Sequence, residues 1–220
     1  MGEVILENAT CFIIGAGDMT VTGIDRKEGD MCIAADGGYL YCKILGIEPD
    51  LVIGDMDSLD GDVRGEIDRL RREVPEKVRV LPAEKDDTDM LAAIKEGFAA
   101  GYRKFCLYGA LGGRVEHTIA NIQCLGYIKN HGAKGYLMDG NLMMTVIRDE
   151  TVRFQESMEG YLSLFCLGER AEGVTIRGMK YLLDGAVLTN DFPIGISNEF
   201  TGEQGSVTVE KGMLLIVITW

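Results

Sequence analysis

Up to about Met138, the sequence alternates short apolar runs with longer segments in which apolar residues recur at helical spacing. This alternation predicts strands that are each followed by a helix. The expected strands cover residues 11–14, 31–35, 51–53, 78–81, 105–108 and 135–138. Strands joined by helical crossovers are usually parallel, and helices then cover their sheet. We therefore expect residues 1–140 to form an α/β domain around a mostly parallel sheet.

The pattern changes after about Asn141, where short β-prone segments are separated by turns rich in Gly, Asp, Asn and Glu. These segments cover residues 143–147, 161–166, 173–176, 206–209 and 214–219, without a convincing long helix between them. Residues 141–220 are therefore expected to form an all-β sandwich or flattened barrel. No Pro- or Ser-rich linker separates the two parts, which predicts that the two domains pack together.

Two aspartates follow the third predicted strand. The sequence there is L-V-I-G-D-M-D-S-L, which places Asp55 and Asp57 just beyond the apolar run 51–53. In an extended segment, side chains two positions apart point the same way, so both carboxylates could face one point. Mg²⁺ takes oxygen ligands and is often bound by one or two carboxylates together with substrate phosphates. The alternative is a solvated acidic loop after a strand.

Three other predicted strands also end in polar or glycine-rich sequence. The second strand runs into Asp36 and two glycines, the fourth into the polar segment 84–89, and the fifth into the glycine-rich segment 109–117. Ligands of parallel α/β sheets bind outside the carboxyl ends of the strands, so these segments together predict one binding site. A structural alternative exists for Asp86 and Asp89, because carboxylates in the first turn of a helix are stabilised by roughly 0.3–1 kcal/mol.

The composition argues against several classes of function. A formal net charge of -13 argues against nucleic acid as a partner, because phosphate backbones select basic surfaces. No signal peptide is evident and no apolar run reaches membrane-spanning length, so no membrane partner is expected. The six cysteines form no C-x-x-C pair, which predicts buried reduced thiols and a cytoplasmic location. With two histidines and no ligand spacing, zinc is not expected.

Six motifs, in their order and spacing, resemble those of bacterial-type thiamine pyrophosphokinases. They are A-A-D-G-G (Ala34–Gly38), P-D-L-V-I-G-D-M-D-S (Pro49–Ser58), K-D-D-T-D (Lys85–Asp89), G-A-L-G-G-R-V-E-H-T-I-A-N (Gly109–Asn121), G-M-K-Y (Gly178–Tyr181) and G-I-S-N-E-F (Gly195–Phe200). The resemblance covers essentially the whole chain. It implies Mg²⁺-dependent transfer of a pyrophosphoryl group from ATP to the hydroxyl of thiamine, giving thiamine diphosphate and AMP. It also implies a homodimer whose sites lie between the N-terminal domain of one subunit and the C-terminal domain of the other.

The resemblance also implies roles for individual residues. The Mg²⁺ ligands would be Asp55, Asp57 and Asp89. Contacts with ATP would come from Asp36, Gly37, Lys85, Thr88, Gly112, Gly113, Arg114 and His117, and contacts with thiamine from Ser197 and Asn198. Catalysis would depend on Asp55, Asp57, Asp86, Asp89 and Arg114. Asp86 and Asp89 are candidates for the base that takes the thiamine proton. Glu116 stands where the family usually has Asp, so a direct role for this carboxylate stays open.

Three other functions fit parts of the sequence. The Asp55 and Asp57 pair also suggests an Mg²⁺-dependent phosphohydrolase of the aspartyl-phosphate type. Such enzymes require the acid pair directly after the first strand, whereas here it follows the third predicted strand. A non-catalytic nucleotide- or thiamine-binding module would not require so many metal-binding carboxylates. A dehydrogenase is least favoured, because Gly15-Ala16-Gly17 lacks the third glycine of the dinucleotide fingerprint.

Overall fold

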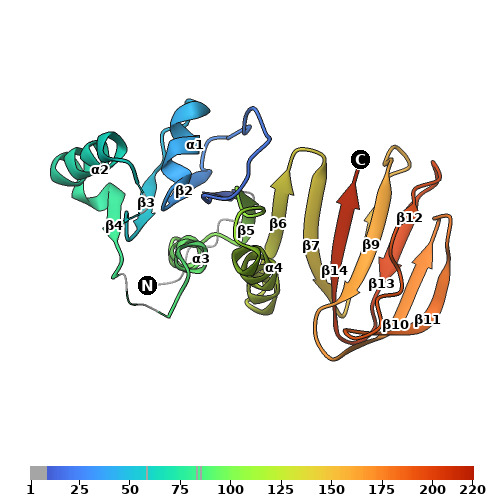
Figure 1. The fold of residues 1–220 in the computed structure, drawn as a ribbon. Coiled ribbons are helices and arrows are strands. Elements are labelled where there is room, and N and C mark those ends of the chain that lie inside the picture. The colour runs from blue at the N-terminus through green and yellow to red at the C-terminus, as the bar shows by residue number, and fades with distance from the viewer. Residues whose placement is uncertain (1–8, 58, 83, 85) are drawn as a thin grey trace. The chain divides into compact units, whose positions relative to one another are not determined.

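The computed structural model describes residues 9–57, 59–82, 84 and 86–220 of the 220-residue chain. The chain divides into two compact units, whose elements are labelled in Figure 1. We call Met1–Cys124 together with Gly132–Gly140 the N-terminal unit. Leu125–His131 together with Asn141–Trp220 form the C-terminal unit. Each unit is described by itself below.

Parallel strands form the centre of the N-terminal unit. They are β1 (Cys11–Ile14), β2 (Met31–Ala35), β3 (Leu51–Gly54), β4 (Val78–Val80), β5 (Lys104–Tyr108) and β6 (Lys134–Asp139). Neighbours pair in parallel throughout the order β6-β5-β1-β2-β3-β4. The connecting helices are α1 (Gly38–Ile44), α2 (Gly61–Glu73), the short 3-10 helix η1 (Pro75–Lys77), α3 (Asp89–Ala99) and α4 (Val115–Asn130). This architecture confirms the mostly parallel α/β domain that the alternation predicts.

Helices cover both faces of this parallel sheet. On one face, Cys42 of α1 and Ile67 of α2 join a buried cluster with strand residues such as Val52. On the other face α3 lies so close that a Cβ atom on Gly97 would come within 2.8 Å of Sγ of Cys11. The inner strands β1, β2 and β3 are shielded from water on both faces and appear as continuous apolar runs, whereas burial alternates along β5 and β6.

The C-terminal unit is a two-sheet antiparallel structure, in agreement with the predicted sandwich. Its strands are β7 (Leu142–Arg148), β8 (Thr151–Phe154), β9 (Tyr161–Cys166), β10 (Arg170–Arg177), β11 (Leu183–Thr189), β12 (Asn198–Glu199), β13 (Gly205–Thr208) and β14 (Met213–Thr219). One sheet has the order β12-β9-β14-β7 and the other the order β11-β10-β13-β8. Leu164 and Ile216 of the first sheet and Val174 and Val207 of the second are fully buried in one shared core.

All six cysteines are free thiols, and four of them are buried. Cys106 and Cys166 are half-buried. Burial raises the pKa of the Cys106 thiol and of the Cys124 thiol to about 11, so both are neutral at physiological pH. Over the described residues, no helix is long and apolar enough to cross a membrane.

Candidate functional site

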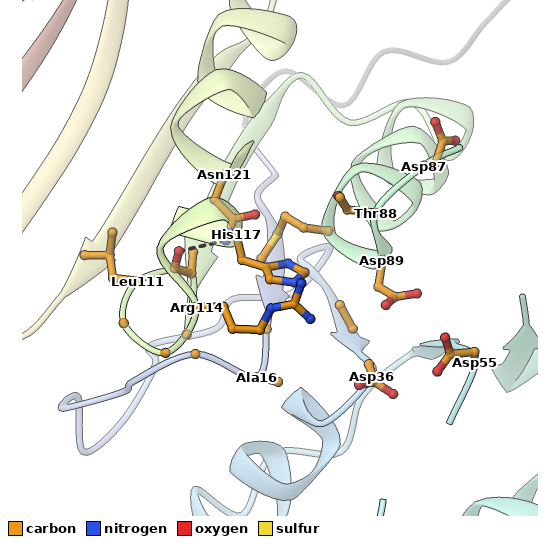
Figure 2. A pocket seen from close by; sticks show the side chains of 18 residues that line it. Ala16, Asp36, Asp55, Asp87, Thr88, Asp89, Leu111, Arg114, His117 and Asn121 are labelled. Atoms are coloured by element: carbon orange, nitrogen blue, oxygen red, sulfur yellow. Dashed lines mark hydrogen bonds between the residues drawn. The ribbon is translucent and has the colours of Figure 1, made fainter. Parts of the chain in front are cut away.

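A cavity of about 690 Å³ opens at the carboxyl ends of the strands in the N-terminal unit (Figure 2). Segments that follow β1, β2, β3 and β5 contribute to its wall, together with the first turns of α3 and α4. Its lining consists of Gly15, Ala16, Gly17, Ala35, Asp36, Asp55, Asp87, Thr88, Asp89, Met90, Gly109, Ala110, Leu111, Gly112, Gly113, Arg114, His117 and Asn121. The cavity therefore lies where parallel α/β sheets bind ligands.

Three aspartates from separate loops stand on one side of this cavity. Figure 2 shows Asp36, Asp55 and Asp89 around the same space. Asp36 leaves β2 with a positive φ of 49°, and its backbone N–H donates to the carbonyl of Ile53 at 2.8 Å, which fixes it beside the end of β3. Asp89 begins α3, whose N-cap Thr88 accepts a hydrogen bond from the backbone of the first turn. Strand pairing and helix capping thus bring carboxylates that are far apart in sequence to one wall.

A cationic side chain faces the same cavity from the start of α4. Arg114 directly precedes this helix, and its Nε donates to Oε1 of Glu116 at 2.7 Å. A hydrogen bond from the backbone N–H of Glu116 and this guanidinium hold the pKa of the Glu116 carboxyl below its usual range. The pairing uses Nε, so the terminal nitrogens of Arg114 are not engaged by Glu116. Glu116 does not line the cavity, whereas Arg114 and His117 do.

The floor of the cavity is made of main chain from two glycine-rich turns. The backbone N–H of Gly17 donates to the carbonyl of Gly109, and that of Asp18 to the carbonyl of Leu111, at 2.8 and 2.7 Å. Gly112 has a φ of 74°, and a Cβ atom there would overlap the Asp18 carboxylate. Close approach of backbone to a ligand is a common reason for glycine in such turns.

Asn121 is a site residue that the sequence analysis did not assign. Its side chain is 8% exposed, lines the cavity and donates from Nδ2 to the carbonyl of Ala110 at 2.7 Å. The signal was present in the sequence, because Asn121 ends the motif that begins at Gly109 and lies four residues after His117. Residues four apart lie above one another on a helix, so Asn121 faces the same space as His117.

Some expected site residues do not line this cavity. Asp57 is exposed, and its backbone N–H donates to Oδ1 of Asp55 at 3.1 Å. Asp86 lines a separate hollow of about 330 Å³ beside the start of α3. Gly37 precedes α1 as its N-cap residue and is not part of the cavity wall. Lys85 lies outside the residues that the structure describes.

The carboxylates fit an Mg²⁺ site that a substrate completes. Within the described ranges, no group of three or more His, Cys, Asp or Glu side chains is arranged to hold a metal ion. Mg²⁺ commonly keeps waters and takes one or two protein carboxylates plus phosphate oxygens, so a partial set of oxygen ligands facing a cavity suits it. Asp36, Asp55 and Asp89 all line this cavity, and one or two of their carboxylates would be enough for such a site.

In the C-terminal unit, the two residues expected to contact thiamine lie beside each other. Ser197 has a positive φ of 57°, and its N–H donates to Oγ of Ser163 at 3.0 Å. Asn198 is 3% exposed, and its side chain accepts from the N–H groups of Tyr181 and Glu199 and donates to the carbonyl of Tyr181. The Asn198 side chain therefore joins the motif 178–181 to the motif 195–200.

Replacing Asn198 with leucine should destabilise the C-terminal unit, because it leaves two backbone N–H groups and one carbonyl without their buried partner. Each such loss costs about 1–3 kcal/mol. Thermal unfolding should show a decrease in Tm of several degrees, whereas Asn190→Leu, at an exposed turn after β11, should leave Tm nearly unchanged. An Asn198→Leu variant as stable as the parent would contradict a structural role for this amide.

Two family models match the chain. "Thiamin pyrophosphokinase, catalytic domain" matches residues 26–137, and "Thiamin pyrophosphokinase, vitamin B1 binding domain" matches residues 149–214. A thiamine pyrophosphokinase of Bacillus subtilis (strain 168) is 28% identical over 192 residues, which cover 86% of this chain and 87% of that protein.

Solved structures agree with these matches. The crystal structure of thiamine pyrophosphokinase from Bacillus subtilis is 26% identical, with a TM-score of 0.82 over 96% of this chain and 98% of that one. A thiamin pyrophosphokinase family protein from Enterococcus faecalis is 25% identical, with a TM-score of 0.81 over 97% and 99%. The similarity therefore extends over both units.

Proposed function

The chain belongs to the thiamin pyrophosphokinase family, and from that premise we propose an Mg²⁺-dependent transfer of pyrophosphate from ATP to the hydroxyl of thiamine. The products are thiamine diphosphate and AMP. The observation that supports this proposal is a cavity at the carboxyl end of a parallel sheet that is lined by Asp36, Asp55 and Asp89 and also by Arg114. Such a set of charges suits a metal-bound polyphosphate.

The residues of the cavity have distinct proposed tasks. Displacement at phosphorus leaves a protein mainly the work of positioning and of stabilising charge. Asp55 and Asp89, with Asp36 close by, would provide carboxylate ligands for Mg²⁺, which when bound neutralises charge on the phosphate oxygens. Arg114 would bind further phosphate oxygens, and the first turn of α4 adds the favourable end of the helix dipole. His117, in that same turn, would contact the nucleotide.

Other roles implied by the family resemblance remain part of the proposal. Asp57 would have to turn toward the cavity to reach the metal, since its side chain is exposed. Lys85 would supply a second cation, and Asp86 or Asp89 would take the proton of the thiamine hydroxyl. The further proposed ATP contacts are Gly37, Thr88, Gly112 and Gly113, and the proposed thiamine contacts are Ser197 and Asn198. We also propose a cytoplasmic homodimer with shared active sites.

The phosphohydrolase alternative requires Asp55 and Asp57 to act as a pair. Only Asp55 of the two lines the cavity, and Asp57 would have to turn toward the cavity in either enzyme, so the two functions are distinguished by their products. Incubation with ATP and Mg²⁺ distinguishes the functions, because a hydrolase releases phosphate without thiamine whereas the proposed enzyme forms AMP only with thiamine present.

The direct test is to incubate the purified protein with ATP, Mg²⁺ and thiamine. We expect AMP and thiamine diphosphate in equal amounts, and a decrease in rate of at least about 100-fold when EDTA removes the metal, because charge stabilisation of that kind contributes several kcal/mol. Restoring Mg²⁺ should restore the rate. AMP formation that does not depend on thiamine, or a rate that EDTA leaves unchanged, would contradict the proposal.

A further inference from the structure

Asn121 occupies a position in the cavity wall that none of the tasks above uses. Asn121 is a buried residue, 8% exposed, and the orientation of its side-chain amide follows from its hydrogen bond. The carbonyl oxygen of Ala110, 2.7 Å away, can only accept a hydrogen bond. The amide nitrogen of Asn121 must therefore face Ala110, and the amide oxygen must face the other way. Figure 2 shows this oxygen directed away from the glycine-rich turn.

An amide oxygen held in this orientation restricts which ligand groups can form a hydrogen bond with it. It accepts hydrogen bonds and donates none, so phosphate oxygens, which are also acceptors, cannot pair with it. Within a nucleotide, its hydrogen-bond partner must be a group that carries an N–H or O–H. A nucleoside offers such donors in its ribose hydroxyls and in the exocyclic amine of adenine.

The position of Asn121 along α4 points to the same part of the ligand. Arg114 directly precedes the helix, where anions are favoured by the backbone N–H groups and the helix dipole. Asn121 lies seven residues further on, which is roughly 10 Å along the axis at the helical rise. The residue that Asn121 contacts in the lining is the apolar Ala110. Phosphates at the start of α4 would therefore place the nucleoside near Asn121.

We infer that Asn121 recognises the nucleoside of the bound nucleotide by accepting a hydrogen bond from a ribose hydroxyl or from the adenine amine. This inference rests on the proposed function, which puts ATP in the cavity. The bond of Asn121 to Ala110 orients the amide for this task. Asn121 is thus a specificity-determining residue, separate from the charged groups that bind the polyphosphate.

The test measures nucleotide binding by calorimetry with Mg²⁺ and without thiamine. The ligands are ATP, 2′-deoxy-ATP, 3′-deoxy-ATP, purine riboside triphosphate (which lacks the exocyclic amine) and inorganic tripolyphosphate. The parent should bind at least one of the three analogues about tenfold more weakly than ATP, the effect of one lost hydrogen bond. The analogue that is affected identifies the donor group.

Asn121→Leu keeps the approximate volume of the side chain and removes its hydrogen bonds. This variant should bind ATP about tenfold more weakly and should no longer distinguish ATP from that analogue, while its affinity for tripolyphosphate stays at the parent level. Gln123→Leu, which replaces an exposed amide on the same helix, should bind every ligand as the parent does. Asn121→Ser, which is too short to reach the nucleoside, repeats the measurement if the leucine variant does not fold.

Three results would overturn the inference. The first is that the parent binds all three analogues with the same affinity as ATP. The second is that the Asn121 variant still distinguishes ATP from an analogue as the parent does. The third is that the affinity of the variant for tripolyphosphate falls as far as its affinity for ATP. The last result would show that Asn121 acts only through the shape of the glycine-rich turn. The proposed function is judged separately: discrimination without thiamine diphosphate formation would refute that function alone, and product formation without discrimination would refute this inference alone.

Discussion

Asp55→Asn is expected to lower kcat by about 100- to 1000-fold, the range seen when a group that stabilises transition-state charge is removed. Asp55 lines the cavity at the end of β3 and is proposed to hold Mg²⁺ with Asp89. Asparagine keeps the shape of the side chain but removes the negative charge. The fold should persist, so Tm should change by no more than a few degrees. The measurement is the steady-state formation of AMP and thiamine diphosphate across a range of Mg²⁺ concentrations.

A matched control lies five residues further along the chain. Asp60 is exposed, precedes α2 and makes no side-chain cap hydrogen bond, so Asp60→Asn should retain the kcat of the parent. If Mg²⁺ binding is the function of Asp55, the Asp55→Asn variant should also need a higher Mg²⁺ concentration to reach half of its maximal rate. Parent-like turnover in that variant at low Mg²⁺ would remove Asp55 from the metal site.

Gly38→Ala is expected to produce the largest loss of stability among single methyl additions to the site region. A Cβ atom on Gly38 would overlap the backbone carbonyl of Ile14, so the start of α1 would have to move away from β1. Backbone cannot rotate out of the way as a flexible side chain can, and overpacking in a core costs about 1–3 kcal/mol or more. At about 2–4 °C per kcal/mol, Tm should decrease by roughly 5–10 °C.

Gly65→Ala adds the same methyl group but is expected to raise Tm rather than to lower it. Gly65 lies inside α2, and a Cβ atom there would meet no other atom within 4 Å. Alanine is favoured over glycine in a helix by roughly 0.5–1 kcal/mol, so this variant should be slightly more stable than the parent. Scanning calorimetry of both variants tests the pair. Equal shifts in Tm would mean that contact with Ile14 does not limit the position of α1.

The order of the elements could be predicted from sequence because it depends on local signals. The inner strands β1, β2 and β3 are almost completely buried and therefore appear as apolar runs, as Cys11–Ile14 does. The turn after β3 could not be predicted in the same way. Met56, between the two aspartates, has a left-handed φ of 62°, which residues other than glycine seldom adopt. The chain is therefore not extended there, and of the two aspartates only Asp55 lines the cavity.

Two asparagines show that the role of a residue cannot be inferred from its type and its motif alone. Asn198 lies in a motif for which family resemblance implies contact with thiamine, yet its amide is bonded to the backbone of Tyr181 and Glu199. No role could be assigned to Asn121 from the sequence, yet this residue lines the cavity. A polar side chain in a motif can serve either the ligand or the backbone, and the choice depends on partners that lie far away in sequence.

The frame of the cavity floor is held by hydrogen bonds between the main chains of residues 15–18 and 108–111. Such bonds do not depend on side-chain identity. Exchanges at Ala16 or Leu111, whose side chains line the cavity, would therefore change the shape and polarity of the wall without loosening its support. These two positions are the natural starting points for redesigning which ligand this cavity accepts.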